Sequence, residues 1–193
     1  MSHDYDAQER ATLLALARQS LAEGLRAGHG AVVRIEDFSA KLRELRASFV
    51  TLHRAGALRG CIGTLDAFRP LVEDVADRAY AAGFRDPRFS AITPEELTEI
   101  DLEISVLTPP EAMTVASEAE LIEQTRPGVD GLLLHSSRYR GTLLPSVWGS
   151  IPGAAEFVAA LRRKAGIPAG TWPDELRVFR YTTEVMAELT PSS

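Results

Sequence analysis

Apolar residues repeat at helical intervals in three long segments of the chain. In Ala7 to Leu25 they recur every three or four positions between charged residues, which predicts an amphipathic helix with one buried stripe. Gly28 follows in the position typical of a helix end. The same spacing predicts helices over Leu71 to Ala82 and over Ala154 to Lys164, and Gly166 follows the last of these as a C-terminal cap.

Two shorter helices are indicated by their first residues. Thr93-Pro94-Glu95-Glu96 combines an N-cap residue, a proline at the first helical position and a glutamate at the third. Ser117 and Glu120 have the same capping spacing, and Pro127-Gly128 would terminate the helix that they open.

Strands are predicted by alternation and by β-branched composition. Ile100 to Leu107 alternates apolar and polar residues, as a strand with one buried face does. Ser48 to Arg54 and Leu58 to Leu65 are separated by Ala55-Gly56-Ala57, which predicts a β-hairpin. Because strands are grouped and do not alternate strictly with helices, the fold class is α+β. Three further strands are expected, over Gly131 to His135, Gly141 to Leu144 and Arg177 to Ala187.

The number of residues in the hairpin loop decides which residues share a face. With an odd number, Thr51 would lie opposite Cys61, and His53 would lie opposite Arg59. Apolar and polar residues would then separate cleanly, whereas an even loop would mix them. We therefore expect an odd loop with Gly56 in the left-handed region. The residues expected on the apolar face are Val50, Leu52, Leu58 and Ile62.

Composition narrows the class of protein. The 193 residues are 45% hydrophobic and 25% charged, close to the average for soluble globular domains, which disfavours wholesale disorder, a collagen-like rod and a coiled coil. The net charge of -6 disfavours nucleic-acid binding, because phosphate backbones attract basic surfaces.

The expected location is the cytoplasm. No apolar run reaches the roughly 18 residues that a membrane span needs, and the polar, acidic N-terminal segment does not look like a secretory signal. Cys61 is the only cysteine, so no internal disulfide can form.

The residues of the hairpin are the main candidates for a functional site. Its polar face would present Thr51, His53, Arg59 and Cys61, and Glu103 would join them if its strand lies in the same sheet. Arg59 and a protonated His53 would favour a reactive thiolate. The alternative is a buried cysteine that serves packing, with glycines that mark a close approach of another backbone. The spacing of the residues leaves both interpretations open.

Several motifs, in this order, resemble the landmarks of the AMMECR domain family, whose prokaryotic members are called AmmeMemoRadiSam system protein A. The resemblance extends from about Leu13 to Tyr181. The motifs are Phe49-Val50-Thr51-Leu52, Leu58-Arg59-Gly60-Cys61-Ile62-Gly63-Thr64, Asp86-Pro87-Arg88-Phe89, Glu95-Glu96-Leu97, Glu103-Ile104-Ser105-Val106-Leu107 and Arg140-Gly141-Thr142-Leu143-Leu144-Pro145-Ser146-Val147-Trp148.

The resemblance implies a single mixed α/β domain over residues 1 to 193. Its central, mostly antiparallel sheet would be flanked by helices, and a cleft would separate a larger from a smaller lobe. The resemblance also implies two partners, a Memo-type protein and a radical S-adenosylmethionine enzyme. It implies no known reaction, and the segment Gly149 to Gly153 departs from the more acidic and aromatic sequence usual in the family.

The candidate site follows from the motifs and the resemblance together. Cys61, Glu103 and His53 are the candidate catalytic residues, with Glu103 to orient a partner or act as a base. His135 lies where the family is variable and is not assigned to the site. The candidate substrate-binding residues are Arg59, Gly60, Gly63, Thr64, Arg88, Arg140 and Thr142.

No cofactor or metal is expected in this chain. Its histidines and cysteine show no metal-ligand spacing, and it has neither a phosphate-binding loop nor a dinucleotide fingerprint. The iron-sulfur cluster and S-adenosylmethionine would belong to the partner enzyme.

The sequence therefore supports two alternative hypotheses about the function. The first is a component that binds a small or peptidic substrate in a cleft, with Cys61 supplying thiol chemistry. The second is a non-catalytic adaptor that docks onto the two partners, with Cys61 as a packing residue. A nucleic-acid module is a weaker third, because the chain is acidic.

Overall fold

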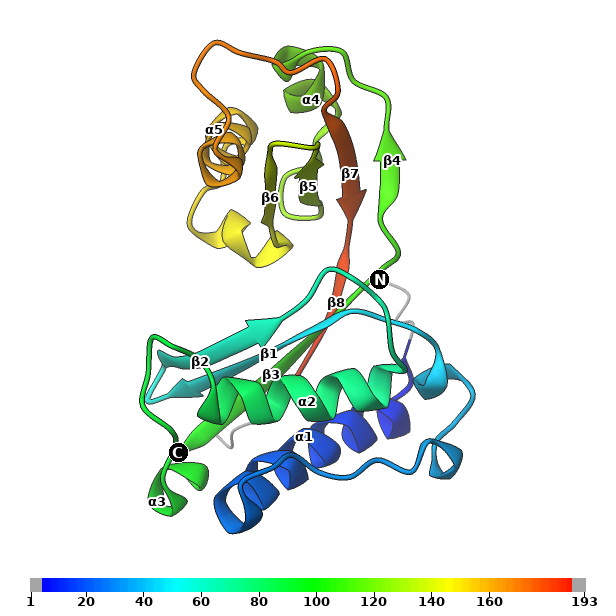
Figure 1. Cartoon of the computed structure of the whole chain (residues 1–193), viewed down its shortest axis with the longest axis vertical. Coiled ribbons are helices and arrows are strands. Elements are labelled where there is room, and N and C mark those ends of the chain that lie inside the picture. The colour runs from blue at the N-terminus through cyan, green and yellow to red at the C-terminus, as the bar shows by residue number, and fades with distance from the viewer. Residues whose placement is uncertain (1–4, 189–193) are drawn as a thin grey trace. The chain divides into compact units, whose positions relative to one another are not determined.

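The structure is a computed structural model that describes residues 5–188 and forms two compact units (Figure 1). Unit 1 contains the chain up to Leu107 together with the residues from Glu184 onward, and unit 2 is Thr108–Thr183. Each unit has its own four-stranded sheet. The fold is thus α+β, as predicted, but it has two separate sheets where one central sheet was expected.

Unit 1 is a sheet with two long helices on the same side (Figure 1). The strand order is β2-β1-β3-β8. Helix α2 packs on β1 and β2, and α1 packs on α2 and β3. The elements are α1 (Ala7–Ala27), β1 (Ser48–Arg54), β2 (Ala57–Gly63), α2 (Leu71–Phe84), α3 (Pro94–Leu97), β3 (Ile100–Leu107) and β8 (Thr183–Ala187), with short 3-10 turns at Ile35–Asp37 and Lys41–Arg43.

Local chemistry explains where the helices of unit 1 begin and end. Asp6 and Glu9 form a capping box at the start of α1, and Gly28 ends that helix in the left-handed conformation with φ 75°. Thr93 and Glu96 form the predicted capping box of α3. The apolar stripe of α1 and the alanine-rich face of α2 meet buried residues of β1 and β3, Val50, Leu52, Leu102 and Ile104 among them.

Unit 2 packs one long helix against a sheet of order β4-β7-β5-β6. Leucines of the sheet meet Phe157 and Leu161 of α5 in the core. Trp148 stacks on Phe157 with 3.8 Å between ring centroids. The elements are β4 (Glu111–Met113), α4 (Glu118–Gln124), β5 (Gly131–His135), β6 (Arg140–Leu143), a 3-10 turn (Pro145–Gly149), α5 (Ala154–Ala165) and β7 (Arg177–Tyr181).

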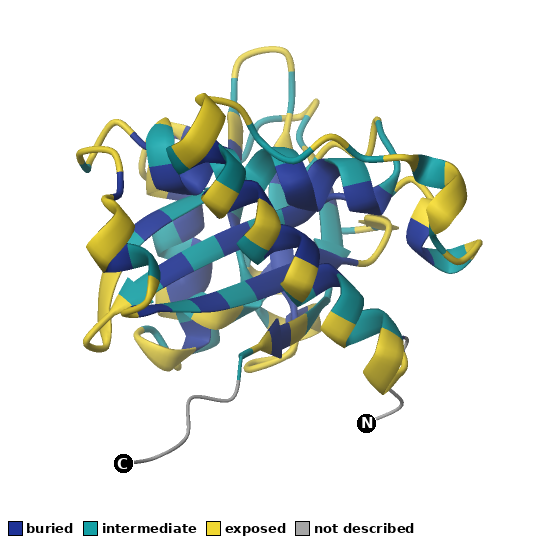
Figure 2. Cartoon of the chain, turned by 90° about the horizontal axis from the view of Figure 1, so that it is seen from below, coloured by how far each residue is buried: buried dark blue, intermediate teal, exposed yellow. Residues whose placement is uncertain are grey.

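Exposed residues gather in loops and on the outer sides of the helices (Figure 2). In the part of the chain that the structure describes, no helix is long and apolar enough to cross a bilayer.

Two of the predicted elements are corrected by the structure. The segment Arg177 to Ala187 is two strands, because the chain leaves one sheet at Tyr181 and enters the other at Thr183. Helix α4 ends at Gln124, three residues before Pro127-Gly128. Its N-cap Ser117 accepts the Glu120 N–H as expected, but the Glu120 carboxylate accepts from the N–H of Ala116.

Candidate functional site

The hairpin of unit 1 has a two-residue loop and a bulge. Arg54 pairs with Ala57, so that Ala55 (φ 50°) and Gly56 (φ 75°) form the turn. The predicted odd loop is therefore wrong, although Gly56 is left-handed as expected. The pairing shifts by one residue between Leu52 and His53, where a bulge in β2 accommodates Arg59. Because of this shift, Thr51 lies opposite Cys61, as predicted.

Cys61, Thr51 and Glu103 form a row across three strands. Thr51 pairs with Cys61 of β2 on one side and with Glu103 of β3 on the other. Paired residues in a sheet point to the same face. The row therefore lies on the face opposite to the buried Val50 and Leu52, because neighbours along a strand point to opposite faces. We name these three residues the thiol row.

The thiol of Cys61 accepts a hydrogen bond from the hydroxyl of Thr51, with 3.3 Å between Oγ1 and Sγ. The backbone N–H of Cys61 donates to the Asp86 carboxylate at 2.9 Å, and its carbonyl accepts from Arg88 Nη2 at 3.2 Å. The backbone N–H and C=O of Cys61 thus point away from β1. Cys61 and Thr51 therefore form a non-hydrogen-bonded pair of the antiparallel ladder, the kind in which the two side chains lie closer together.

Asp86 and Arg88 form a clamp on the outer edge of β2. The guanidinium donates twice to the carboxylate, from Nε at 2.9 Å and from Nη2 at 2.7 Å. These hydrogen bonds, helped by the backbone N–H groups of Cys61 and Arg88, hold the pKa of the buried Asp86 carboxyl well below its usual range, although burial opposes them. The clamp fixes the backbone on which the thiol stands, and the Arg88 guanidinium already has an anionic partner.

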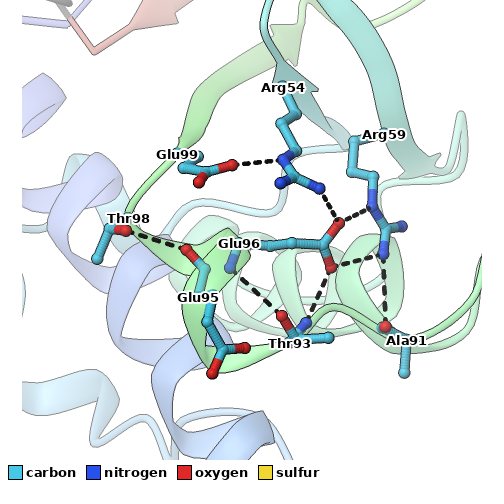
Figure 3. A network of polar contacts seen from close by, with 8 residues as sticks. All are labelled: Arg54, Arg59, Ala91, Thr93, Glu95, Glu96, Thr98 and Glu99. Carbon is cyan, nitrogen blue, oxygen red and sulfur yellow. Dashed lines mark hydrogen bonds and ion pairs between the residues drawn. The ribbon is translucent and has the colours of Figure 1, made fainter.

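Arg59 points to α3 and is bound there by Glu96 (Figure 3). Its Nε and Nη2 donate to the two carboxylate oxygens at 2.8 and 3.0 Å. Arg54 donates to the same carboxylate at 3.0 Å and to Glu99 at 2.6 Å, and the N–H of Thr93 adds a bond to Glu96 at 2.9 Å. We name Arg54, Arg59, Glu96 and Glu99 the hairpin network.

The electrostatics of this network centre on Glu96. Its side chain and that of Arg59 are each only 12% exposed. The hydrogen bonds from Arg59, and after them the N–H of Thr93, lower the pKa of Glu96 to about 2, while burial acts in the opposite direction. The guanidinium of Arg59 therefore neutralises a carboxylate of its own chain.

The other candidate residues of unit 1 lie as follows. His53 is opposite Leu58 and Asp101, so the predicted pairing of His53 with Arg59 is wrong because the bulge intervenes. Thr64 donates its N–H to the carbonyl of Ser48 at 3.1 Å and accepts the N–H of Asp66 on its hydroxyl.

Both glycines beside Cys61 lie where a side chain would collide with the protein itself. A Cβ on Gly60 would stand 2.2 Å from the carbonyl oxygen of Ala82 in α2, and one on Gly63 would stand 2.2 Å from the ring of Phe49. The close approach that the sequence indicated is thus to a helix backbone and to an aromatic ring.

Arg140 and Thr142 belong to unit 2, on β6. The Thr142 hydroxyl donates to the carbonyl of Leu132 at 2.8 Å and lies 2.7 Å from the hydroxyl of Tyr181. Burial raises the pKa of Tyr181 to about 12. Arg140 lies opposite His135 in the ladder of β5 and β6.

Three residues around the site were not among the predicted site residues. The sequence marks Glu96 by a capping box and a family motif, and Asp86 by a family motif only. Thr51 was placed correctly, but nothing in the sequence indicated its bond to sulfur. In the described range 5–188, no group of three or more histidine, cysteine, aspartate or glutamate side chains is arranged to hold a metal ion.

Comparison with known proteins supports the resemblance. The family model described as AMMECR1 matches residues 14–186. A protein of Methanothermobacter thermautotrophicus is 40% identical over 185 residues, 93% of this chain and 94% of the relative. Protein MJ0810 of Methanocaldococcus jannaschii is 36% identical, over 84% of this chain and 83% of its own.

A solved structure is also similar. The crystal structure of uncharacterized protein PH0010 from Pyrococcus horikoshii aligns with a TM-score of 0.82 and 34% identity, and the alignment covers 93% of this chain and 91% of that one. The family model and these relatives agree over nearly the whole length of the chain. The chain belongs to the AMMECR1 family.

Proposed function

We propose that this chain works in the cytoplasm as a component of an AmmeMemoRadiSam-type system, with a radical S-adenosylmethionine enzyme and a Memo-type protein. Within it, the thiol row of unit 1 binds a small or peptidic substrate, and Cys61 supplies thiol chemistry. The observation that carries the chemical part is the hydrogen bond from Thr51 to the Cys61 sulfur, on the face of the sheet that the core does not use. Membership of the AMMECR1 family supports the choice of partners.

The geometry suggests distinct tasks for the three residues. Thr51 orients the sulfur, because a hydroxyl that donates to it fixes its direction. Glu103 lies two strands from Cys61, about 10 Å between backbones at the usual strand spacing. At that distance its carboxylate would act on a substrate that covers Thr51 and would not take the proton of the thiol directly.

Alkylation of Cys61 tests the chemical part of this proposal. Iodoacetamide is added to the folded protein at a series of pH values, and the rate of mass increase is compared with that of an unstructured peptide thiol. We expect the folded protein to react at least as fast as the peptide. Thr51→Val, which keeps the shape and removes the hydroxyl, should change the rate or its pH profile. Reaction slower than that of the peptide, or only after unfolding, would refute the catalytic role.

The adaptor remains the second candidate, and a specific observation favours it. The guanidinium groups of Arg88 and Arg59 already bind Asp86 and Glu96. Gly60 and Gly63 are explained by internal packing. An anionic substrate group at Arg59 would have to compete with Glu96, which already binds Nε and Nη2 of the guanidinium. These contacts are what a purely structural hairpin would need.

A capture experiment separates the two candidates. Tagged wild-type protein and Cys61→Ser are each used to capture the radical enzyme and the Memo-type protein of the same genome. The thiol proposal expects both variants to bind the partners and only the wild type to restore the phenotype of a deletion strain. Restoration by Cys61→Ser as well would support the adaptor.

A further inference from the structure

Unit 2 has a hollow of about 580 Å³ that the proposed function does not use. It lies where β5 ends and β7 begins, beside the turn that precedes β7. Its volume falls in the range of small-molecule sites, about 300–1,000 Å³. Its lining includes His135, Ser137, Asp174, Glu175, Leu176 and Arg177.

The charged residues of this hollow come from two parts of the fold. His135 and Arg177 are direct cross-strand partners on β5 and β7, so their side chains stand together on one face of the sheet. Asp174 and Glu175 come from the turn before β7. All four are exposed to solvent and can be reached by a ligand.

The basic and the acidic residues of the hollow do not form ion pairs with each other. Among residues 5–188, neither Arg177 nor Asp174 has an ion-pair partner, although only two residues separate them in the chain. Glu175 accepts only the hydroxyl of Ser137, at 3.5 Å. A hollow that holds both an unpaired guanidinium and unpaired carboxylates is complementary to a molecule that carries both a negative and a positive group.

We propose that this hollow binds a zwitterionic ligand of the amino-acid or short-peptide class. The ligand's carboxylate binds Arg177 and His135, its ammonium group binds Asp174 and Glu175, and Leu176 contacts an apolar side chain. A phosphate group fits less well, because the two carboxylates in the same hollow would repel it. The site uses no residue of the thiol row and does not depend on the chemistry of Cys61.

A titration with a dipeptide and its blocked forms tests both ends of this ligand. Glycyl-leucine is added to isotope-labelled full-length protein, and the backbone amide signals of residues 135–137 and 174–177 are followed. We expect these signals to shift in a saturable way. N-acetyl-glycyl-leucine and glycyl-leucine amide, which each lack one charge, should bind at least tenfold more weakly. Free leucine, run in parallel, shows whether an amino acid or a peptide is preferred.

Variants of the hollow provide the controls. Arg177→Gln and Asp174→Asn should each weaken glycyl-leucine binding at least tenfold, whereas Arg163→Gln and Glu123→Gln, at exposed positions of α5 and α4, should leave it unchanged. Cys61→Ser should bind like the wild type, so that failure of the thiol proposal does not affect this one. Absence of binding, equal binding of a blocked dipeptide, or inorganic phosphate shifting the same signals with equal affinity would overturn the proposal.

Discussion

Replacing Glu96 with glutamine is expected to lower the free energy of unfolding by about 2–3 kcal/mol. The carboxylate accepts from Arg54, from Arg59 and from the N–H of Thr93, and its side chain is 12% exposed. Glutamine would present an NH₂ group to a guanidinium and leave the mostly buried charge of Arg59 without a counterion. Urea denaturation of the wild type and Glu96→Gln measures the difference.

The effect should depend on pH in a defined direction. The pKa of Glu96 is lowered to about 2 in the folded protein, below its ordinary value of 4.5. A carboxyl with a lowered folded pKa stabilises the protein above its ordinary pKa and loses this contribution as the pH falls toward the folded pKa. The difference between wild type and Glu96→Gln should therefore be constant near neutrality and shrink between pH 4.5 and 2.

Glu95→Gln is the matched control, because it removes a carboxylate from the same short helix at an exposed position. It should change stability little. If Glu95→Gln and Glu96→Gln were equally destabilising, or if the Glu96→Gln effect did not vary in acid, the hairpin network would not hold α3 to the hairpin in the way that its contacts indicate.

Gly60→Ala is expected to destabilise the protein by about 3 kcal/mol, at the upper end of the usual range for overpacking. The added Cβ would lie 2.2 Å from the carbonyl oxygen of Ala82, and this oxygen belongs to the backbone of α2 and cannot rotate away.

Gly149→Ala provides the comparison for Gly60→Ala. A Cβ at Gly149 meets no atom within 4 Å, and this glycine does not have a positive φ. Its thermal unfolding temperature should stay close to that of the wild type, while that of Gly60→Ala drops by several degrees. Similar unfolding temperatures for the two variants would contradict the close contact between Gly60 of β2 and the Ala82 carbonyl of α2.

Elements with strong local patterns were predictable from the sequence. Strand β3 has the predicted bounds, Ile100–Leu107. Its first residues alternate between buried and half-buried positions, as the pattern of apolar and polar residues predicts, and its last four residues are all buried. The capping box at Thr93 and the glycine cap at Gly166 were likewise identified, since both depend on neighbouring residues only. In each case the residues that determine the element lie within it or next to it.

Contacts that depend on distant residues were not predictable. The bulge at Arg59 restores the register that an even loop would lose, and no local pattern distinguishes this from an odd loop. The choice of Glu96 as the partner of Arg59 depends on where α3 packs. The division of the last strand at Thr182 depends on the two sheets, because Arg177–Tyr181 pairs in one of them and Thr183–Ala187 in the other.

The order of strands has a consequence for synthesis on the ribosome. Unit 2 is encoded within a single uninterrupted stretch, Thr108–Thr183, whereas unit 1 receives its fourth strand, with the buried Met186, only after that stretch has been translated. A nascent chain can therefore complete the inserted unit while the edge of β3 in the first unit still lacks its neighbour. Unit 1 therefore lacks one strand of its sheet until translation has passed unit 2, and until then the edge of β3 is open to pairing with other strands.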